Sequence, residues 1–221
     1  FFEMKRTKVA IQGIKGSFHD QVTQEYYTAA PELLECSTFD VLAKALAQGS
    51  CDQGVMAIEN SIAGSIIPNY ALIDQYGLFS VGGHYLGIEH NLMVLPGQKI
   101  EDINEVHSHP MALLQCKLFF EAFPHIKLVE SNDTAEVAME IQKNNTHGIG
   151  AIASKSASEI YGLTILNASI QTIKNNVTRF VIVEKSDPKT SEAISKGAWK
   201  FILDHKRGSL ATALNVVSDC S

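Results

Sequence analysis

Short apolar runs alternate with longer amphipathic segments along most of this chain. Phe39, Leu42 and Leu46, for example, recur at helical spacing on one face. The apolar runs that predict strands lie at 8–13, 32–37, 54–60, 79–97, 104–110, 127–131, 148–154, 163–168 and 177–184. The segments that predict helices lie at 17–27, 38–46, 65–76, 111–123, 133–144 and 156–162. Alternation of this kind is typical of α/β proteins.

Certain residues set the expected ends of these elements. Ser37 and Asp133 each stand three positions before an acidic residue, a pattern typical of helix N-termini. Gly162 predicts the end of a helix, and Pro68 predicts an early interruption of its helix. The pair Gly82–Gly83 predicts a break in a β-rich stretch.

The order of strands and helices restarts once, which predicts two lobes with a cleft between them. We expect mostly parallel sheets with helices on both faces. Lobe 1 is expected at about 8–83 plus 178–184, with the last strand returning to it, and lobe 2 at about 84–177.

The C-terminal part predicts a separate unit. Residues 185–197 are polar without a period and predict a linker. Residues 198–221 predict a strand, a turn at Gly208 and a helix. Because only 25 residues run from Gly197 to Ser221, we expect this domain to be incomplete.

Composition narrows the possible partners and the compartment. The net charge is −6 and no basic cluster is present, so we expect no nucleic-acid partner. No apolar run approaches the ~20 residues that span a bilayer. Four scattered cysteines without a C-x-x-C pair, and no signal-like stretch before the first strand, predict a cytoplasmic protein without disulfides.

Five loops precede predicted helices, at 12–18, 58–66, 108–110, 131–135 and 153–157, and four of them are rich in Ser, Gly, Asn or Thr. In open α/β sheets, ligands bind at the carboxyl ends of strands against helix N-termini. Each helix N-terminus stabilises an anion by about 0.3–1 kcal/mol. Converging loops would therefore hold a small carboxylate despite the net negative charge. The same residue types also cap helices that bind no ligand, so each loop alone fits both interpretations.

The stretch NNVTRF places Thr178 and Arg179 at the start of the last predicted strand. Arginine keeps its charge, and an unpaired buried charge costs several kcal/mol. Arg179 therefore either turns to water or an ion pair, or it meets an anionic ligand. Glu59 fits a general acid or base and equally an outward carboxylate that balances a cation.

Other candidates for chemistry are weaker. His107 and His109 would point the same way on a strand, but no third ligand at a recognisable spacing completes a metal site. The chain has neither a P-loop nor a G-x-S-x-G motif, so nothing indicates a bound nucleotide or a serine nucleophile.

The segment NNVTRFVIVE resembles the Thr-Arg-Phe signature of prephenate dehydratases. Four more segments resemble the same family in order, namely GVMAIENSIAGSI, HSHPMALLQC, SNDTAEVA and AIASKSASEIYGLTIL. The resemblance extends from Val9 to Glu184. The tail WKFILDHKRGSLATALNVV resembles the first strand and helix of an ACT regulatory domain, which follows the catalytic part in this family.

The resemblance implies a fold and a reaction. The fold would be like type II periplasmic binding proteins, with a catalytic domain at 8–184 and a truncated α+β ACT domain at 198–221. The reaction would convert prephenate to phenylpyruvate, carbon dioxide and water, with no metal or organic cofactor. Phenylalanine would inhibit at the ACT domain, where Gly208, Ser209 and Leu210 match a characteristic turn. A homodimer or homotetramer would be expected.

The resemblance also implies site residues. Arg179 would pair with one substrate carboxylate, Thr178 would donate a hydrogen bond to the departing hydroxyl, and Glu59 or water would supply a proton. Phe180 would pack beside the ring. The substrate oxygens would be bound by Asn60, Ser61, Ser65, Ser17 and Ser108. Met111 and Thr172 depart from the usual family pattern.

Two other interpretations stay open. The same loops would serve a cytoplasmic two-lobed sensor that binds a carboxylate or amino acid without chemistry. A regulatory subunit with vestigial lobes is the third possibility, and the intact Thr-Arg-Phe stretch counts against it.

Overall fold

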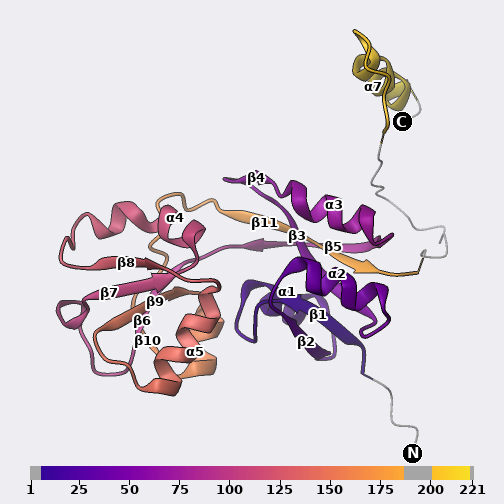
Figure 1. Cartoon of the computed structure of the whole chain (residues 1–221). Helices are drawn as coiled ribbons and strands as arrows, with labels where there is room; N and C mark the ends of the chain where they lie inside the picture. The colour runs from indigo at the N-terminus through magenta and orange to yellow at the C-terminus, as the bar shows by residue number, and fades with distance from the viewer. Residues whose placement is uncertain (1–5, 187–200, 220–221) are drawn as a thin grey trace, which may run out of the picture. The chain divides into compact units, whose positions relative to one another are not determined.

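The computed structural model describes residues 6–186 and 201–219 (Figure 1). The chain divides into two compact units, Phe1–Pro188 and Lys189–Ser221. The first unit contains two sheets, each with its own helices, and this confirms a two-lobed α/β architecture.

The first sheet has six strands, five of them in the order β2-β1-β3-β11-β5. They are β1 (Lys8–Gln12), β2 (Glu32–Cys36), β3 (Gln53–Asn60), β5 (Phe79–Gly87) and β11 (Val177–Glu184), with β4 (Gly64–Ser65) beside β3. Its helices are α1 (Phe18–Tyr26), α2 (Phe39–Ala47) and α3 (Ile67–Gln75).

The second sheet has five strands in the order β10-β6-β9-β7-β8. They are β6 (Asn91–Val94), β7 (Glu105–Ser108), β8 (Lys127–Glu130), β9 (Ile149–Ala153) and β10 (Thr164–Asn167). Its helices are α4 (Pro110–Phe120), α5 (Thr134–Asn144) and α6 (Lys155–Tyr161), with a short 3₁₀ turn η1 (Ile100–Asp102).

Both sheets are mixed, so the prediction of mostly parallel sheets is wrong. The strands β2, β1 and β3 are parallel, as are β9, β7 and β8, whereas β11, β5, β6 and β10 pair antiparallel to their neighbours. In the first sheet the reason is that the chain leaves along β5 and returns along β11 in the opposite direction, so these two strands pair antiparallel. The predicted return of the last strand is confirmed, because β11 lies between β3 and β5.

The chain leaves the first sheet four residues later than the sequence predicted. Strand β5 runs through Gly82–Gly83 without a break and continues to Gly87, which pairs with Val177. The pairing skips Val81 instead, a register irregularity of the kind found at a β-bulge. The crossing between lobes therefore follows Gly87.

Helix ends match the sequence in part. Asp133 caps α5 by accepting from two backbone N–H groups, and Gly162 ends α6 in a left-handed conformation, both as predicted. Thr38 rather than Ser37 caps α2, because its Oγ1 accepts from the N–H of Val41 at 3.2 Å. Pro68 lies in the first turn of α3 and starts that helix instead of interrupting it.

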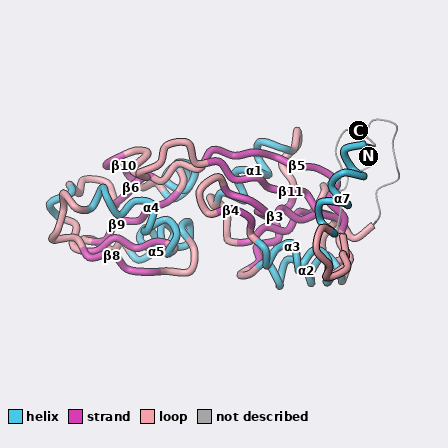
Figure 2. Tube along the Cα trace, turned by 90° about the horizontal axis from the view of Figure 1, so that it is seen from above, coloured by secondary structure: helices cyan, strands magenta, loops and turns pink. Residues whose placement is uncertain are grey.

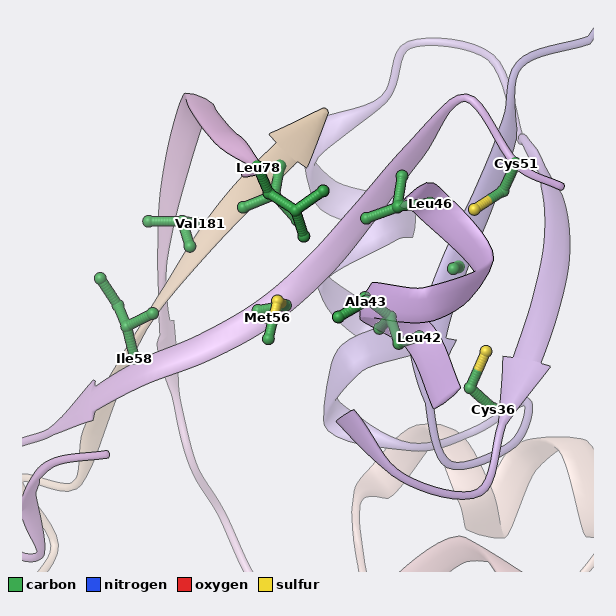
Figure 3. Packing of buried hydrophobic residues seen from close by; sticks show 11 residues of the cluster. Cys36, Leu42, Ala43, Leu46, Cys51, Met56, Ile58, Leu78 and Val181 are labelled. Atoms are coloured by element: carbon green, nitrogen blue, oxygen red, sulfur yellow. The ribbon is translucent and has the colours of Figure 1, made fainter. Parts of the chain in front are cut away.

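Each sheet is covered on both faces by apolar packing. In one core of the first lobe, Leu42 and Leu46 of α2 pack with Met56 of β3 (Figure 3), and Leu72 of α3 packs against this core. Another core buries α1 against the opposite face through Val22 and Phe180. In the second lobe α4 covers one face of the sheet, while α5 and α6 cover the other, as Figure 1 shows for α4 and α5; Figure 2 gives the view from above.

A loop of the first lobe contacts α6 of the second. Ser154 Oγ donates to the carbonyl of Gly16 at 2.6 Å, and the Tyr161 hydroxyl donates to the carbonyl of Lys15 at 2.6 Å. Gly16 has φ +89, and a Cβ there would stand 3.2 Å from Cα of Ala157. Only glycine meets both demands without strain, so this contact fixes how the two lobes meet.

The second unit is described over residues 201–219. Gly208 has φ +89 and precedes α7 (Ser209–Asp219), which confirms the predicted turn and helix. Residues 201–204 form no strand, and the first residues of the predicted strand lie outside the described part. None of the described helices has the length and apolar character needed to cross a membrane.

Candidate active site

A cavity of about 480 Å³ is lined by residues from both lobes. Its volume falls in the range of ligand pockets, roughly 300–1,000 Å³. The N-cap residues of five helices line it, namely Ser17 of α1, Thr38 of α2, Ile66 of α3, His109 of α4 and Asp133 of α5. The first turns of α-helices leave backbone N–H groups unpaired and carry the positive end of the helix dipole.

Four of the five predicted polar loops therefore converge on one cavity. The loop at 153–157 contributes no lining residue, since Ser154 and Ala157 serve the contact between lobes. The start of α2 also lines the cavity, through Ser37, Thr38 and Phe39, which was not predicted.

The cavity carries little formal charge. Among the lining residues of the described chain there is no lysine or arginine, and Asp133 supplies the single carboxylate. Burial raises the pKa of Asp133, and hydrogen bonds from the N–H groups of Glu136 and Ala135 oppose that rise. Attraction of an anion must therefore come from helix N-termini and neutral donors.

Thr178 lies in the cavity wall and is 7% exposed. Its Oγ1 accepts a hydrogen bond from Nδ2 of Asn60 at 2.9 Å. No acceptor for its own O–H is found among the described residues, so this proton can be donated to a ligand. The cavity thus holds a positioned hydroxyl donor at the residue that the sequence singled out.

Phe180 also lines the cavity, two residues after Thr178 on β11. Its ring meets the imidazole of His19 edge-on, with centroids 5.0 Å apart, and His19 meets Phe39 in the same way at 5.3 Å. Burial lowers the pKa of His19 to about 4, so its ring is neutral near pH 7. This aromatic wall suits a planar or near-planar carbon ring.

Arg179 and Glu59 do not line the cavity. They are opposite each other on β11 and β3, with Nη1 and Oε2 4.0 Å apart and side chains 37% and 50% exposed. The Arg179 guanidinium also lies 5.9 Å from the ring centroid of Tyr85. Arg179 thus forms the ion pair that was one of its two interpretations. Because it does not line the cavity, this arrangement does not fit the predicted contact between Arg179 and a substrate carboxylate.

The predicted serines divide in the same way. Ser17 lines the cavity, where its Oγ accepts from the N–H of Asp20. Ser61, Ser65 and Ser108 are not lining residues. Ser61 bonds to the backbone of Asn175 and Val177, exposed Ser65 pairs with Glu59, and buried Ser108 donates to the carbonyl of Ile152 at 2.7 Å. The hydroxyls of Ser61 and Ser108 therefore serve the fold, whereas Ser65 is the strand partner of Glu59 through the backbone.

His107 and His109 have different hydrogen-bond partners. His107 contacts Glu105 at 2.8 Å, whereas His109 accepts from the N–H of Met111 as the cap of α4.

Of the two departures from the family pattern, Met111 lines the cavity and Thr172 does not.

Gln115, His90 and Asn176 are further polar lining residues that the sequence did not single out. Asn176 stood inside the quoted NNVTRF stretch. Gln115 lies one helical turn beyond Met111 and Ala112, so its position on the cavity face of α4 was readable from spacing. His90 gave no such signal, because it lies in an irregular crossing between β5 and β6.

Fold and cavity together define a two-lobed α/β protein with a ligand-sized cavity between its lobes. The family profile described as prephenate dehydratase matches residues 9–188. The chain therefore belongs to the prephenate dehydratase family.

Similar proteins agree with this assignment. The chain is 37% identical to arogenate dehydratase 2 of Petunia hybrida, covering 97% of this chain and 54% of that protein. It is 35% identical to arogenate dehydratase/prephenate dehydratase 2, chloroplastic, of Arabidopsis thaliana, covering 96% and 55%. The prephenate dehydratase structure from Staphylococcus aureus superposes with a TM-score of 0.78 at 25% identity, covering 97% and 80%. The chain spans about half the length of these two plant relatives.

Proposed function

We propose that this protein converts prephenate to phenylpyruvate, with release of carbon dioxide and water. The observation that carries the proposal is the Thr178 hydroxyl, held by Asn60 in a cavity where five helices begin. Prephenate is a dianion whose ring becomes aromatic when it loses one carboxylate together with the ring hydroxyl. The substrate itself supplies the driving force, so the protein has to bind the dianion and assist the leaving group.

Neutral groups bind the dianion in this proposal. Helix N-termini contribute about 0.3–1 kcal/mol each toward an anion, and each hydrogen bond to a charged group about 1.5–3 kcal/mol. Several of these interactions replace the guanidinium contact that the sequence had suggested. The aromatic wall of Phe180, Phe39 and His19 receives the ring.

Thr178 polarises the departing hydroxyl by donating its proton in a hydrogen bond. A threonine hydroxyl is a weak acid, so water completes the proton transfer. Positioned proton transfer typically contributes about 10²–10⁴ in rate. Glu59 stays in its pair with Arg179 on the exposed side of the sheet and takes no direct part in this step.

The test is a dehydratase assay that follows phenylpyruvate formation in the complete protein. Thr178→Val removes the hydroxyl and keeps the shape of the side chain. We expect kcat to fall by roughly 10²–10³, as for loss of one transition-state hydrogen-bond donor, and Thr178→Ser to retain most activity.

The matched control is Thr172→Val, on the exposed segment nearby, which should leave kcat unchanged. If folded wild type gives no turnover, the sensor interpretation replaces the proposed enzyme. Near-normal kcat in Thr178→Val would instead remove only the role assigned to this hydroxyl.

Arogenate is a second candidate substrate. It replaces the keto group of prephenate by an ammonium and so carries less net negative charge. A lining without lysine or arginine, and with Asp133 present, fits this smaller charge, and the two plant relatives carry arogenate in their names. Comparing kcat/KM for the two substrates in one preparation decides between them.

Regulation, assembly and compartment are part of the same proposal. We propose that phenylalanine binds the ACT domain that begins at residue 198 and that pairs of ACT domains form a homodimer or homotetramer. The turn at Gly208 and helix α7 support this reading of the segment, with Ser209 and Leu210 at its start. A cytoplasmic location is supported by the free thiols of Cys36, Cys51 and Cys116.

A further inference from the structure

Four polar side chains form one hydrogen-bonded series across the two lobes. Asn60 at the end of β3 contacts Asn176, with Nδ2 2.7 Å from the Oδ1 of Asn176. Asn176 Nδ2 lies 2.9 Å from Oε1 of Gln115 on α4, and the same oxygen is 2.9 Å from Nε2 of His90. All four residues line the cavity.

The orientation of every amide in this series follows from two backbone groups. The N–H groups of Ile62 and Ala63 both point at one side-chain atom of Asn60, each at 2.9 Å. A backbone N–H can only donate, so that atom is the carbonyl oxygen Oδ1. The NH₂ group of Asn60 must therefore face Thr178 and Asn176, and its two hydrogens are used there.

The orientations of Asn176 and Gln115 and the protonated nitrogen of His90 follow in turn. Because Asn60 donates to Asn176, the facing atom of Asn176 is its oxygen, and its NH₂ group turns to Gln115. Gln115 must then accept with Oε1, whose two lone pairs are taken by Asn176 and His90. His90 therefore carries its proton on Nε2, and Nδ1, which has no partner among the described residues, is bare.

We propose that Asn176 is a positioning residue that turns the NH₂ group of Gln115 into the cavity as a hydrogen-bond donor for the anionic substrate. No acceptor for Nε2 of Gln115 is found among the described residues, so both of its hydrogens remain for a ligand. This inference rests on the proposed function for its substrate, but the amide orientation stands on the geometry alone.

Neutral His90 is consistent with this arrangement. Burial, the largest cause, lowers the pKa of His90 to about 4, and the hydrogen bond to Gln115 opposes that change. The ring therefore stays uncharged near pH 7 and acts as a single N–H donor toward Gln115. Its 2.9 Å contact helps to keep the amide from turning over.

The first test needs no variant. Imidazole ¹⁵N chemical shifts of His90 in the complete wild-type protein report which ring nitrogen carries the proton. We expect a neutral ring protonated at Nε2. A ring protonated at Nδ1 would mean that the amide of Gln115 has the opposite orientation. This result would overturn the proposal, whether or not the protein turns over prephenate.

The second test reverses the series with Asn176→Asp, which keeps the size of the side chain but removes its donor. Gln115 then has to donate to the new carboxylate and turn its oxygen into the cavity. Nε2 of His90 would face an NH₂ group, so the ring should switch its proton to Nδ1. An anionic substrate meets an oxygen in place of a donor, and we expect KM to rise about 10- to 100-fold with a smaller change in kcat.

The matched control is Asn175→Asp, which adds the same charge one residue away. Asn175 is exposed, and its contact with Ser61 uses only its backbone carbonyl. We expect the His90 proton to stay on Nε2 and KM to change less than about 3-fold, the scatter of weak surface effects. An Asn176→Asp protein with an unchanged His90 ring or a wild-type KM overturns the proposal, whereas an inactive wild type with the expected tautomer refutes only the proposed function.

Discussion

Two buried histidines decide what kind of charge the cavity offers. His19 and His90 both line it, and burial lowers the pKa of each to about 4. Near pH 7 both rings are neutral, so they add donors and aromatic surface but no positive charge. A dianion bound here would be held by hydrogen bonds and helix dipoles, which orient it by direction as well as by attraction.

The low pKa of His19 predicts a pH-dependent stability. Its folded value, about 4, lies below the unfolded value of about 6.5, so as pH falls the unfolded chain takes up a proton first. The stabilising contribution is complete above pH 6.5 and declines down to pH 4. His19→Gln should flatten the fall in unfolding free energy in this window by up to ~1.4 kcal/mol per pH unit.

Denaturant titrations at half-unit steps from pH 7 to pH 4 measure this slope. His90 titrates in the same window, so part of the slope should survive in the variant. The exposed His147 provides the control, since His147→Gln should reproduce the wild-type slope. An equally steep slope in His19→Gln would show that His19 is not buried as a neutral ring.

At the scale of elements, the cavity is made by the starts of helices. The N-cap residues of α1 to α5 all reach it, although these helices belong to two different sheets. Four of the caps use a side chain to accept from the first turn, and α3 begins without a side-chain cap. Capping and ligand binding therefore use neighbouring N–H groups of the same helix turns.

The structure predicts which of two adjacent residues stabilises α2. Thr38 accepts from the N–H of Val41, whereas Ser37 is exposed and has no hydrogen bond within the described chain. Thr38→Ala should lower the free energy of unfolding by about 0.5–2 kcal/mol, and Ser37→Ala by less than about 0.5 kcal/mol.

Thermal or denaturant unfolding of the two variants in parallel gives the comparison. The pair controls for position, since both residues stand before the same helix and line the same cavity. If Ser37→Ala lowered the free energy of unfolding more than Thr38→Ala, Ser37 would be the cap of α2, as the sequence first suggested.

At the scale of the molecule, two lobes meet through a few specific contacts. The Gly16 loop packs on α6, and Asn176 joins Asn60 of one lobe to Gln115 of the other. Such contacts can be made or broken together when the lobes move. If two ligands bind to different sites and each prefers one arrangement of the lobes, each changes the affinity for the other by the same factor.

This coupling predicts an effect of phenylalanine on the complete protein. If phenylalanine binds the segment that begins at residue 198 and favours one lobe arrangement, kcat/KM for prephenate should fall by about 5-fold or more. Initial rates with and without saturating L-phenylalanine measure the effect, with D-phenylalanine as the control. Equal kcat/KM under all three conditions would contradict the regulatory role.

The alternation of side chains along β11 shows which site residues the sequence could predict. Side chains on a strand alternate, so Thr178 and Phe180 had to share one face and Arg179 the other. All three were nevertheless predicted to contact the substrate, whereas only Thr178 and Phe180 line the cavity. Local geometry could have corrected Arg179, but it could not say which face of β11 meets the cavity.

Features that depend on near neighbours along the chain can be predicted from the sequence alone. These are the order of strands and helices, the cap at Asp133, the stop at Gly162 and the family motifs. The mixed sheets and the start of α2 at the cavity depend on how the chain folds in three dimensions. The contact between Asn176 and Gln115, 61 residues apart, depends on it as well. Contacts of that separation depend on how two independently patterned lobes pack, and no local spacing encodes that packing.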